Sequence, residues 1–218
     1  MIKLSAASKM PCKSWSLEAM VTCPGSVNAS TGEVAEACSI CYARDGFYNM
    51  PVVKALRVHN KEDWKRDEFV PEFIIKLDTE RYFRWFDSGD CYSLKLAWKM
   101  YAIMLATPWC NHWFPTRQHK FDKFKEVLDA MDLLPNVVVR RSSDSISGGV
   151  VSGANSSTIV PYVETEINFL GNSEVCLAYE RKGKCDTCRA CWDKDVEVII
   201  YPAHGRKASK LIKMREAA

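Results

Sequence analysis

The sequence has no long apolar run and almost no excess of charge of either sign. A membrane-spanning helix needs roughly 18 apolar residues in succession, and no stretch of the 218 residues has them. The net charge of +3 permits contact with nucleic acid without indicating it. The first residues also lack the apolar segment of a secretory signal. We therefore expect no membrane association and a cytoplasmic location.

The sequence also lacks a long linker, a repeat of fixed period and the composition of a disordered chain. Apolar residues make up 47% and charged residues 26%, which is ordinary for a globular protein. A chain of this length suits one compact domain with a small appendage. We place the main domain at 1–170 and a Cys-rich extension, packed on the same domain, at 171–218.

Cysteine is the residue that the sequence has in excess, with ten in all. In a reducing cytosol, thiols stay free or bind metal, which disfavours a disulfide framework. Cys91 and Cys110 lie in apolar surroundings and are predicted to be core residues. The other eight form an N-terminal group of Cys12, Cys23, Cys38 and Cys41 and a C-terminal group of Cys176, Cys185, Cys188 and Cys191.

The middle of the chain alternates between strand-like and helix-like segments. Helical spacing of apolar residues over 50–77 predicts one or two helices with a break near Pro71. An order of strand, helix, strand, helix, strand implies parallel strands joined by right-handed crossovers. The predicted strands are 82–86, 112–116, 136–142 and 196–204, and the predicted helices between the first three are 92–107 and 120–134.

The N-terminal group contains a candidate metal site with three ligands. Cys38 and Cys41 form a C-x2-C pair, and Cys23 joins them if the Gly-, Ser- and Asn-rich segment between 23 and 38 loops back. Structural zinc takes four protein ligands, and a 4Fe–4S cluster also has four corners. Three thiolates would therefore leave one corner open for a substrate or cofactor. The alternative is that all three are buried structural thiols.

Three cysteines that end in "CxxCYA", followed by an α/β chain, resemble the radical S-adenosylmethionine (SAM) enzymes. Most of that superfamily has the spacing C-x3-C-x2-C, whereas this chain has C-x14-C-x2-C. The long first gap, "TCPGS" and a late "C-x2-C-x2-CW" are similar to the gene product eighty-eight family of bacteriophages. The resemblance implies a partial (β/α) barrel with a Cys-rich C-terminal extension, and a location in the host cell.

The resemblance also implies roles for particular residues. Cys23, Cys38 and Cys41 would hold a 4Fe–4S cluster, with SAM on the fourth iron. Tyr42 would lie near the adenine. A turn after the first middle strand would hold the SAM amino group, because glycine permits close approach and a carboxylate pairs with an ammonium. The candidates for that contact are Ser88, Gly89 and Asp90. The alternative is a plain strand-to-helix turn with Asp90 as the N-cap.

Two further strand ends carry polar residues that suit a cofactor. Arg117 follows the second middle strand, and arginine binds a carboxylate with two parallel hydrogen bonds. Ser142 and Asp144 follow the third, where they are candidates for a ribose. The segment 142–157 is Gly- and Ser-rich, and such loops are either mobile or functional. The alternative for each residue is a solvated polar rim.

The C-terminal group has the spacing C-x8-C-x2-C-x2-C. Cys176, Cys185, Cys188 and Cys191 would make a closed four-thiolate site. The C-x2-C-x2-C run is typical of an auxiliary iron–sulfur cluster, and structural zinc is the alternative. A third arrangement, in which both groups share one centre, stays open.

The sequence thus favours an iron–sulfur protein of radical-SAM type that cleaves SAM at a 4Fe–4S cluster. The substrate is not visible. The alternative is a non-enzymatic phage protein with bound iron–sulfur or zinc that interacts with nucleic acid or a host partner.

Overall fold

A computed structural model describes residues 1–7, 9–28, 30–161, 171–204 and 206–216. Over these residues the strands form one eight-stranded sheet of order β1-β2-β3-β4-β5-β6-β8-β7. β1 is antiparallel to β2, and the other neighbours are parallel. The strands are β1 Ser5–Ala6, β2 Lys13–Trp15, β3 Tyr82–Trp85, β4 Asn111–Thr116, β5 Val137–Ser142, β6 Ser156–Val160, β7 Ser173–Val175 and β8 Val198–Pro202.

Six α-helices accompany the sheet in the described ranges: α1 Glu36–Ser39, α2 Pro51–Asp63, α3 Phe69–Lys76, α4 Leu94–Ala106, α5 Lys125–Asp132 and α6 Arg206–Glu216. Short 3-10 helices are η1 Pro24–Ser26, η2 Tyr42–Arg44, η3 Gly46–Asn49, η4 Gln118–Lys120, η5 Asp122–Phe124 and η6 Ala190–Trp192. None of the described helices has the length and apolar character needed to cross a bilayer.

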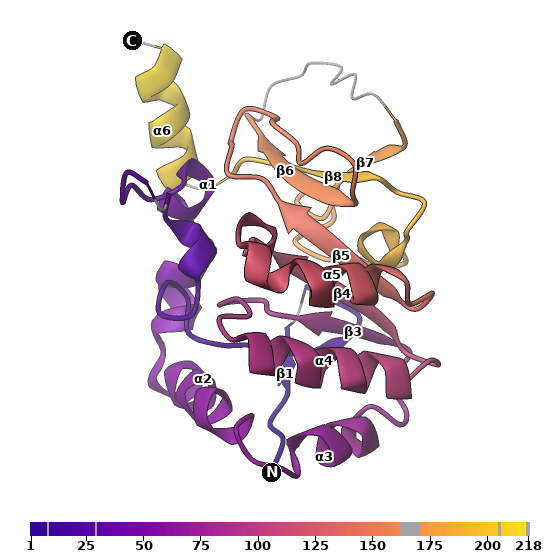
Figure 1. Cartoon of the computed structure of the whole chain (residues 1–218). Helices are drawn as coiled ribbons and strands as arrows, with labels where there is room; N and C mark the ends of the chain where they lie inside the picture. The colour runs from indigo at the N-terminus through magenta and orange to yellow at the C-terminus, as the bar shows by residue number, and fades with distance from the viewer. Residues whose placement is uncertain (8, 29, 162–170, 205, 217–218) are drawn as a thin grey trace.

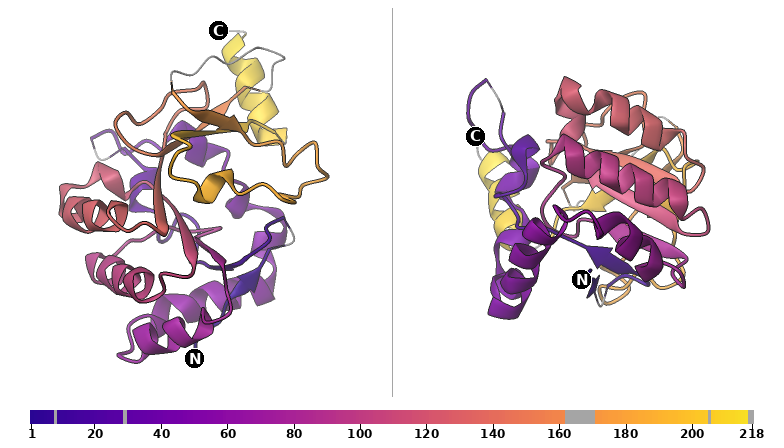
Figure 2. Two further views of the ribbon diagram at one scale, coloured as in Figure 1. Left: turned by 90° about the vertical axis from the view of Figure 1, so that its right-hand side faces the viewer. Right: turned by 60° about the horizontal axis from the view of Figure 1, so that its bottom comes forward.

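The strands from β2 to β6 are added to the sheet in the order in which they occur in the chain. Right-handed crossovers between successive parallel strands place their helices on one face. Figure 1 shows α3, α4 and α5 side by side on that face, and the right-hand view of Figure 2 shows them covering the sheet. The fold is therefore mixed α/β with an open sheet, and the carboxyl ends of β2 to β6 lie along one edge.

The face of the sheet that meets the helices is apolar. Phe83 and Trp85 alternate with polar residues along β3 and are buried against Phe73 of α3, whose ring stacks on Trp85 at a centroid distance of 5.0 Å. Cys91 and Cys110 lie in the same core, fully buried, as the sequence predicted. These two thiols therefore belong to the scaffold.

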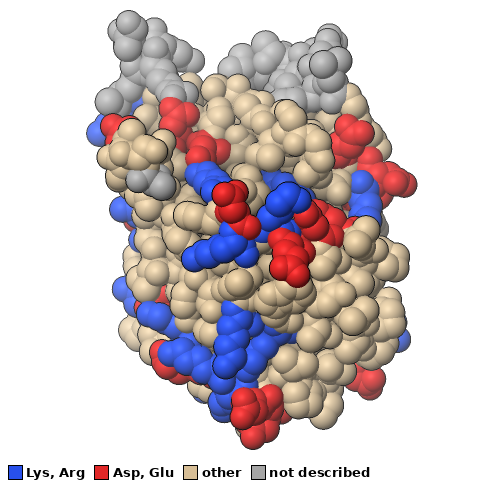
Figure 3. All heavy atoms as spheres, viewed as in Figure 1, with Lys and Arg blue, Asp and Glu red and all other residues tan. Residues whose placement is uncertain are grey.

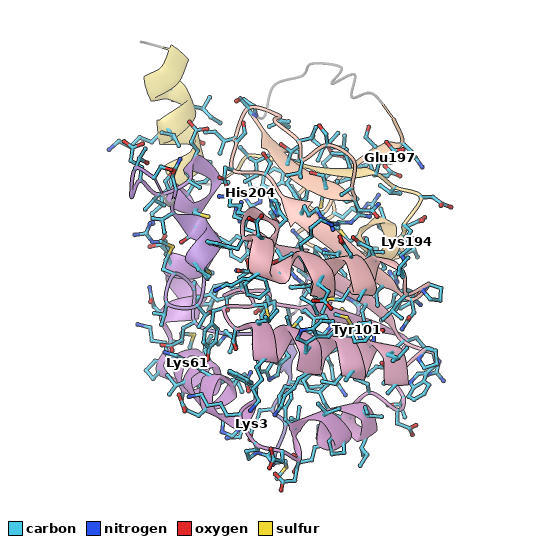
Figure 4. All side chains as sticks on the ribbon, viewed as in Figure 1. Lys3, Lys61, Tyr101, Lys194, Glu197 and His204 are labelled. Carbon is cyan, nitrogen blue, oxygen red and sulfur yellow. The ribbon has the colours of Figure 1, made fainter. Side chains whose placement is uncertain are left out.

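The opposite face carries a mixture of polar, charged and aromatic side chains on the same strands. Ser14, Arg84 and Trp113 are register neighbours across β2, β3 and β4, and Arg140 lies on β5. The C-terminal segment packs on this face, where Trp192 Nε1 donates to the Phe83 carbonyl at 2.9 Å. Lys194 Nζ donates to two carbonyls at the end of α5, both at 2.6 Å (Figure 4).

The middle strands and helices agree with the sequence prediction, with two differences. The helical segment 50–77 breaks over 64–68, before Pro71, which falls in the first turn of α3, where a missing N–H is tolerated. The segment 120–134 begins with short 3-10 turns, and α5 starts only at Lys125. The domain boundary predicted at 170 falls beside residues 162–170, outside the described residues. β7 and β8, both after it, belong to the same sheet.

Charges of both signs are interspersed on the face seen in Figure 3. This mixture agrees with the small net charge of +3.

Candidate functional site

The segment between Cys23 and Cys38 loops back on itself. An isolated antiparallel bridge forms inside the excursion, and the Ala35 N–H donates to the Ser26 carbonyl at 2.8 Å. The two ends of the excursion therefore meet, and α1 begins beside the end of η1. This hairpin brings Cys23 back to the C-x2-C pair despite the long gap in sequence.

The three N-terminal thiols are electrostatic neighbours. The pKa of the Cys23 thiol is raised to about 12, mainly by burial and in addition by the nearby Asp90 carboxylate. Cys38 and Cys41 raise it further, because a second negative charge close by opposes ionisation. The three thiols thus lie near enough to affect one another's ionisation, in a partly enclosed setting. A bound cation would favour their thiolate forms, which are the ones that ligate metals.

Cations lie beside Cys38. Burial raises the pKa of its thiol, and the Arg117 guanidinium and the Lys120 ammonium oppose that shift. We call residues 23–41 the cysteine loop. Lys120 Nζ donates to the Gly25 carbonyl at 2.9 Å, which fixes the lysine charge beside this loop. Lys120 was not predicted from the sequence, because nothing in the sequence shows that the turn after β4 lies next to the cysteine loop.

The turn after β3 anchors the start of the cysteine loop. Ser88 Oγ donates to the Leu17 carbonyl at 2.8 Å. Gly89 has a φ of +75°, and a Cβ there would lie 2.7 Å from Thr22 Oγ1 and from Leu17 Cβ. Only glycine fits this close approach. The Asp90 N–H donates to the Thr22 carbonyl at 3.2 Å. The turn therefore fixes residues 17–22, directly before Cys23.

The Asp90 carboxylate connects the ends of two strands. It accepts the Cys91 N–H at 2.7 Å, the Thr116 hydroxyl at 2.8 Å and the Arg117 N–H at 2.9 Å. Burial raises its pKa despite these donors. The alternative that Asp90 is the N-cap of the following helix is wrong, because the N-cap of α4 is Ser93.

Tyr42 lies beside Asp87, just past the carboxyl end of β3. Its hydroxyl donates to the Asp87 carbonyl at 2.8 Å and accepts from an Arg84 NH group at 3.3 Å. The ring is 56% exposed. It also contacts the Tyr48 ring at a centroid distance of 5.5 Å. The polar end is thus fixed while much of the ring stays open to solvent.

Arg117 and Asp144, predicted separately as cofactor contacts, contact each other. Arg117 Nε donates to Asp144 Oδ1 at 3.1 Å, and Lys120 forms a second ion pair with the same carboxylate. The Asp144 carbonyl accepts the Ala37 N–H at 2.9 Å. Ser142 contacts β6 instead, where its hydroxyl accepts from that of Ser157 at 3.4 Å. Arg117 and Asp144 therefore position α1, which carries Cys38.

The four C-terminal cysteines also lie as neighbours. Burial raises the pKa of the Cys185 thiol, and the nearby Cys176 and Cys188 raise it further. Burial raises the pKa of Cys191 to about 11, and its Sγ lies 3.5 Å from the Tyr201 hydroxyl. Figure 1 shows α1 and the short helix 190–192 well apart. The two cysteine groups are therefore separate in the structure.

Cys12 falls in the C-terminal group, although its sequence position placed it in the N-terminal one. Its thiol is buried with Trp113 and Trp192, and Cys185 and Cys191 pack against this cluster. All ten cysteines are free. Among the residues that the structure describes, no three or more His, Cys, Asp or Glu side chains form a group that could hold a single metal ion.

Fold and site define a mixed α/β protein with one set of cysteines at the carboxyl edge of its sheet and another on the sheet face opposite the helices. The family model of Gene product 88 matches residues 2–194. The chain belongs to this phage-type family, as its cysteine motifs suggested. No curated protein and no solved structure matches the chain.

Proposed function

We propose that this chain is an iron–sulfur protein of radical-SAM type, in which Cys23, Cys38 and Cys41 hold a 4Fe–4S cluster. The observation that carries the proposal is the hairpin that returns Cys38 and Cys41 to the neighbourhood of Cys23 at the carboxyl ends of parallel strands. That edge is where α/β proteins with parallel strands bind their ligands.

The donor set suits a cluster with one corner that the protein leaves open. Three thiolates are too few for a closed four-ligand site. Arg117 and Lys120 favour ionisation of Cys38 and supply positive charge beside an anionic centre. When bound, such a cluster supplies one electron for reductive cleavage of SAM. The protein's own part is to hold the thiols, orient the ligand and limit access of water.

The sheet supports a partial barrel of radical-SAM type. Parallel strands added in chain order, with helices on one face, are the arrangement found in one side of a (β/α) barrel. The face opposite the helices would then be the interior. We propose that SAM and substrate enter at the carboxyl edge beside the cysteine loop.

The predicted cofactor contacts divide into two kinds. Tyr42 has an exposed ring, which we propose lies against the adenine, and Ser142 is a candidate for the ribose. The other five form hydrogen bonds or close contacts with the cysteine loop, with the residues before it or with each other. We therefore propose that they mainly position the cluster and the amino and carboxylate groups of SAM. These are Ser88, Gly89, Asp90, Arg117 and Asp144.

We propose a second centre at the C-terminal group. The C-x2-C-x2-C run favours a 4Fe–4S cluster over zinc. This centre would relay electrons or bind substrate.

The test is SAM cleavage by protein purified and assayed without oxygen. Reduced wild-type protein incubated with SAM should yield 5′-deoxyadenosine. Cys38→Ala should abolish that product. Cys110→Ala, which alters a core thiol outside both groups, should retain it. Protein that contains iron but yields no 5′-deoxyadenosine would instead favour a non-enzymatic role with nucleic acid or a host partner.

A further inference from the structure

A fifth thiol, that of Cys12, lies beside the proposed C-terminal centre. Cys12 comes from the turn that joins β1 to β2, far from the others in sequence. It is 7% exposed, in a buried cluster against which Cys185 and Cys191 pack. Cys185 also acts electrostatically on the Cys12 thiol. A four-cornered centre can use only four of the five.

The backbone ties the Cys12 turn to the C-terminal segment. The Cys185 N–H donates to the Lys9 carbonyl at 2.9 Å. The Trp192 ring, next to Cys191, contacts Trp113 at a centroid distance of 5.2 Å within the same buried cluster. Cys12 and the C-terminal cysteines are therefore parts of one packed unit.

Arg140 brings a buried positive charge to this unit. Its guanidinium is fully buried and donates only to main-chain carbonyls. The acceptors are Ala190, Cys191, Asp193 and Val196, at 2.7 to 3.0 Å. Arg140 thus fixes the segment around Cys191.

Arg84 brings a second positive charge. Its guanidinium lies 4.3 Å from the centroid of the Trp113 ring and donates to Met10 Sδ. Its Nε is buried without a hydrogen-bond partner.

Neither arginine forms an ion pair with a carboxylate in the described ranges. Burial of a cation is costly unless an anion lies nearby. The acidic groups that act on Arg84 from a distance are Tyr42, Asp87 and Tyr201, and those that act on Arg140 are Cys191, Tyr201 and Asp193. A centre held by four thiolates is anionic and would offset both charges.

Cys188 differs from the other four. It is exposed and lines a surface hollow of about 370 Å³ with Arg181 and Arg189. A ligand at a closed protein centre is normally shielded from water, because the surrounding shell controls solvent access.

We propose that Cys12 is a ligand of the C-terminal centre together with Cys176, Cys185 and Cys191, and that Cys188 stays outside it. This assignment rests on the proposed function, since it requires a metal centre at this site, and it keeps the first and last cysteines of the C-x2-C-x2-C run as ligands while Cys12 takes the place of the middle one. It makes the centre a link between the first hairpin of the chain and the Cys-rich extension.

The test counts iron, sulfide and zinc in a Cys38→Ala background, which removes the N-terminal centre. Cys12→Ala added to it should lower the remaining metal from about four irons per chain, or one zinc, to nearly none. Cys188→Ala should leave the metal in place, and so should the control Cys91→Ala, which alters a core thiol. Cys12→Ser, closer in size to cysteine, guards against a simple packing defect, and circular dichroism reports whether each variant folds.

The outcomes separate the two proposals. Metal kept in folded Cys12 variants, or lost in Cys188→Ala, would overturn this assignment and leave the C-terminal centre standing. No metal in the Cys38→Ala background alone would refute the centre itself.

Discussion

Arg117 Nε donates to Asp144 Oδ1 at 3.1 Å, and this pair joins the ends of β4 and β5 beneath the N-terminal cysteines. The same aspartate holds Ala37 of α1 through its carbonyl. The relationship explains why two strand ends, separated by a helix in sequence, act on one loop. The pair sets the position and the charge around Cys38.

Asp144→Asn should weaken the N-terminal centre with little effect on global stability. The side chain is 42% exposed, so its ion pairs contribute about 0–1 kcal/mol to the free energy of unfolding. Loss of a residue that orients ligands typically weakens metal binding by about 10- to 100-fold. Iron retention during chelator titration measures this effect. Asp129→Asn, which removes an exposed ion pair on α5, is the control, and equal retention in both variants would contradict the role of Asp144.

Gly89→Ala should destabilise the fold more than the same change at Gly153. Both glycines have positive φ, at +75° and +74°, which costs a residue with a Cβ about 1–2 kcal/mol. The added Cβ at 89 also lies 2.7 Å from Leu17 Cβ, whereas at 153 nothing lies within 4 Å. We expect losses of about 2–4 and about 1 kcal/mol, measured by urea unfolding. Equal losses would contradict the close contact between Gly89 and residues 17–22, directly before Cys23.

His112 should make the metal-free protein sensitive to acid. Its Nδ1 accepts from Trp85 Nε1 at 3.2 Å, and its Nε2 lies 2.9 Å from Thr107 Oγ1. The Thr107 hydroxyl donates to the Ile103 carbonyl, so Nε2 carries the proton and the ring is neutral. Burial lowers the pKa of His112 from 6.5 to about 3.

Because the folded-state pKa lies below the unfolded one, the stability from neutral His112 is present above pH 6.5 and lost as the pH falls towards 3. The loss should be on the order of 5 kcal/mol. His112→Gln, which keeps an acceptor for Trp85, should remove this part of the pH dependence. The same acid profile in wild type and variant would contradict the assignment.

The sequence was informative where secondary structure has a strong local signal. The strand at 136–142 carries three valines in a row, and the helices beside it have clear apolar periodicity, so the α/β order was predictable. β2 and β6 were missed because they are short and contain small polar residues, Lys and Ser in β2 and Ser and Thr in β6, without an alternating apolar pattern.

The site was predictable in part for the same reason. Residues at the carboxyl ends of parallel strands meet at one edge, so Arg117 and Asp144 could be named from the strand order. Cys12 was grouped with the other N-terminal cysteines because it is near them in sequence. In the fold, however, β2 and its neighbour β3 are separated by residues 16–81, which contain the cysteine loop and two helices. A long crossover of this kind has no local signal, so only the structure places Cys12 beside Cys185.

The measurement that tests the central claim most directly is the iron and sulfide content of protein purified without oxygen. Two 4Fe–4S centres predict about eight irons per chain in the wild type and in Cys110→Ala, and about four in Cys38→Ala. Colourless wild-type protein with zinc alone or with no metal, or equal iron in wild type and Cys38→Ala, would contradict it.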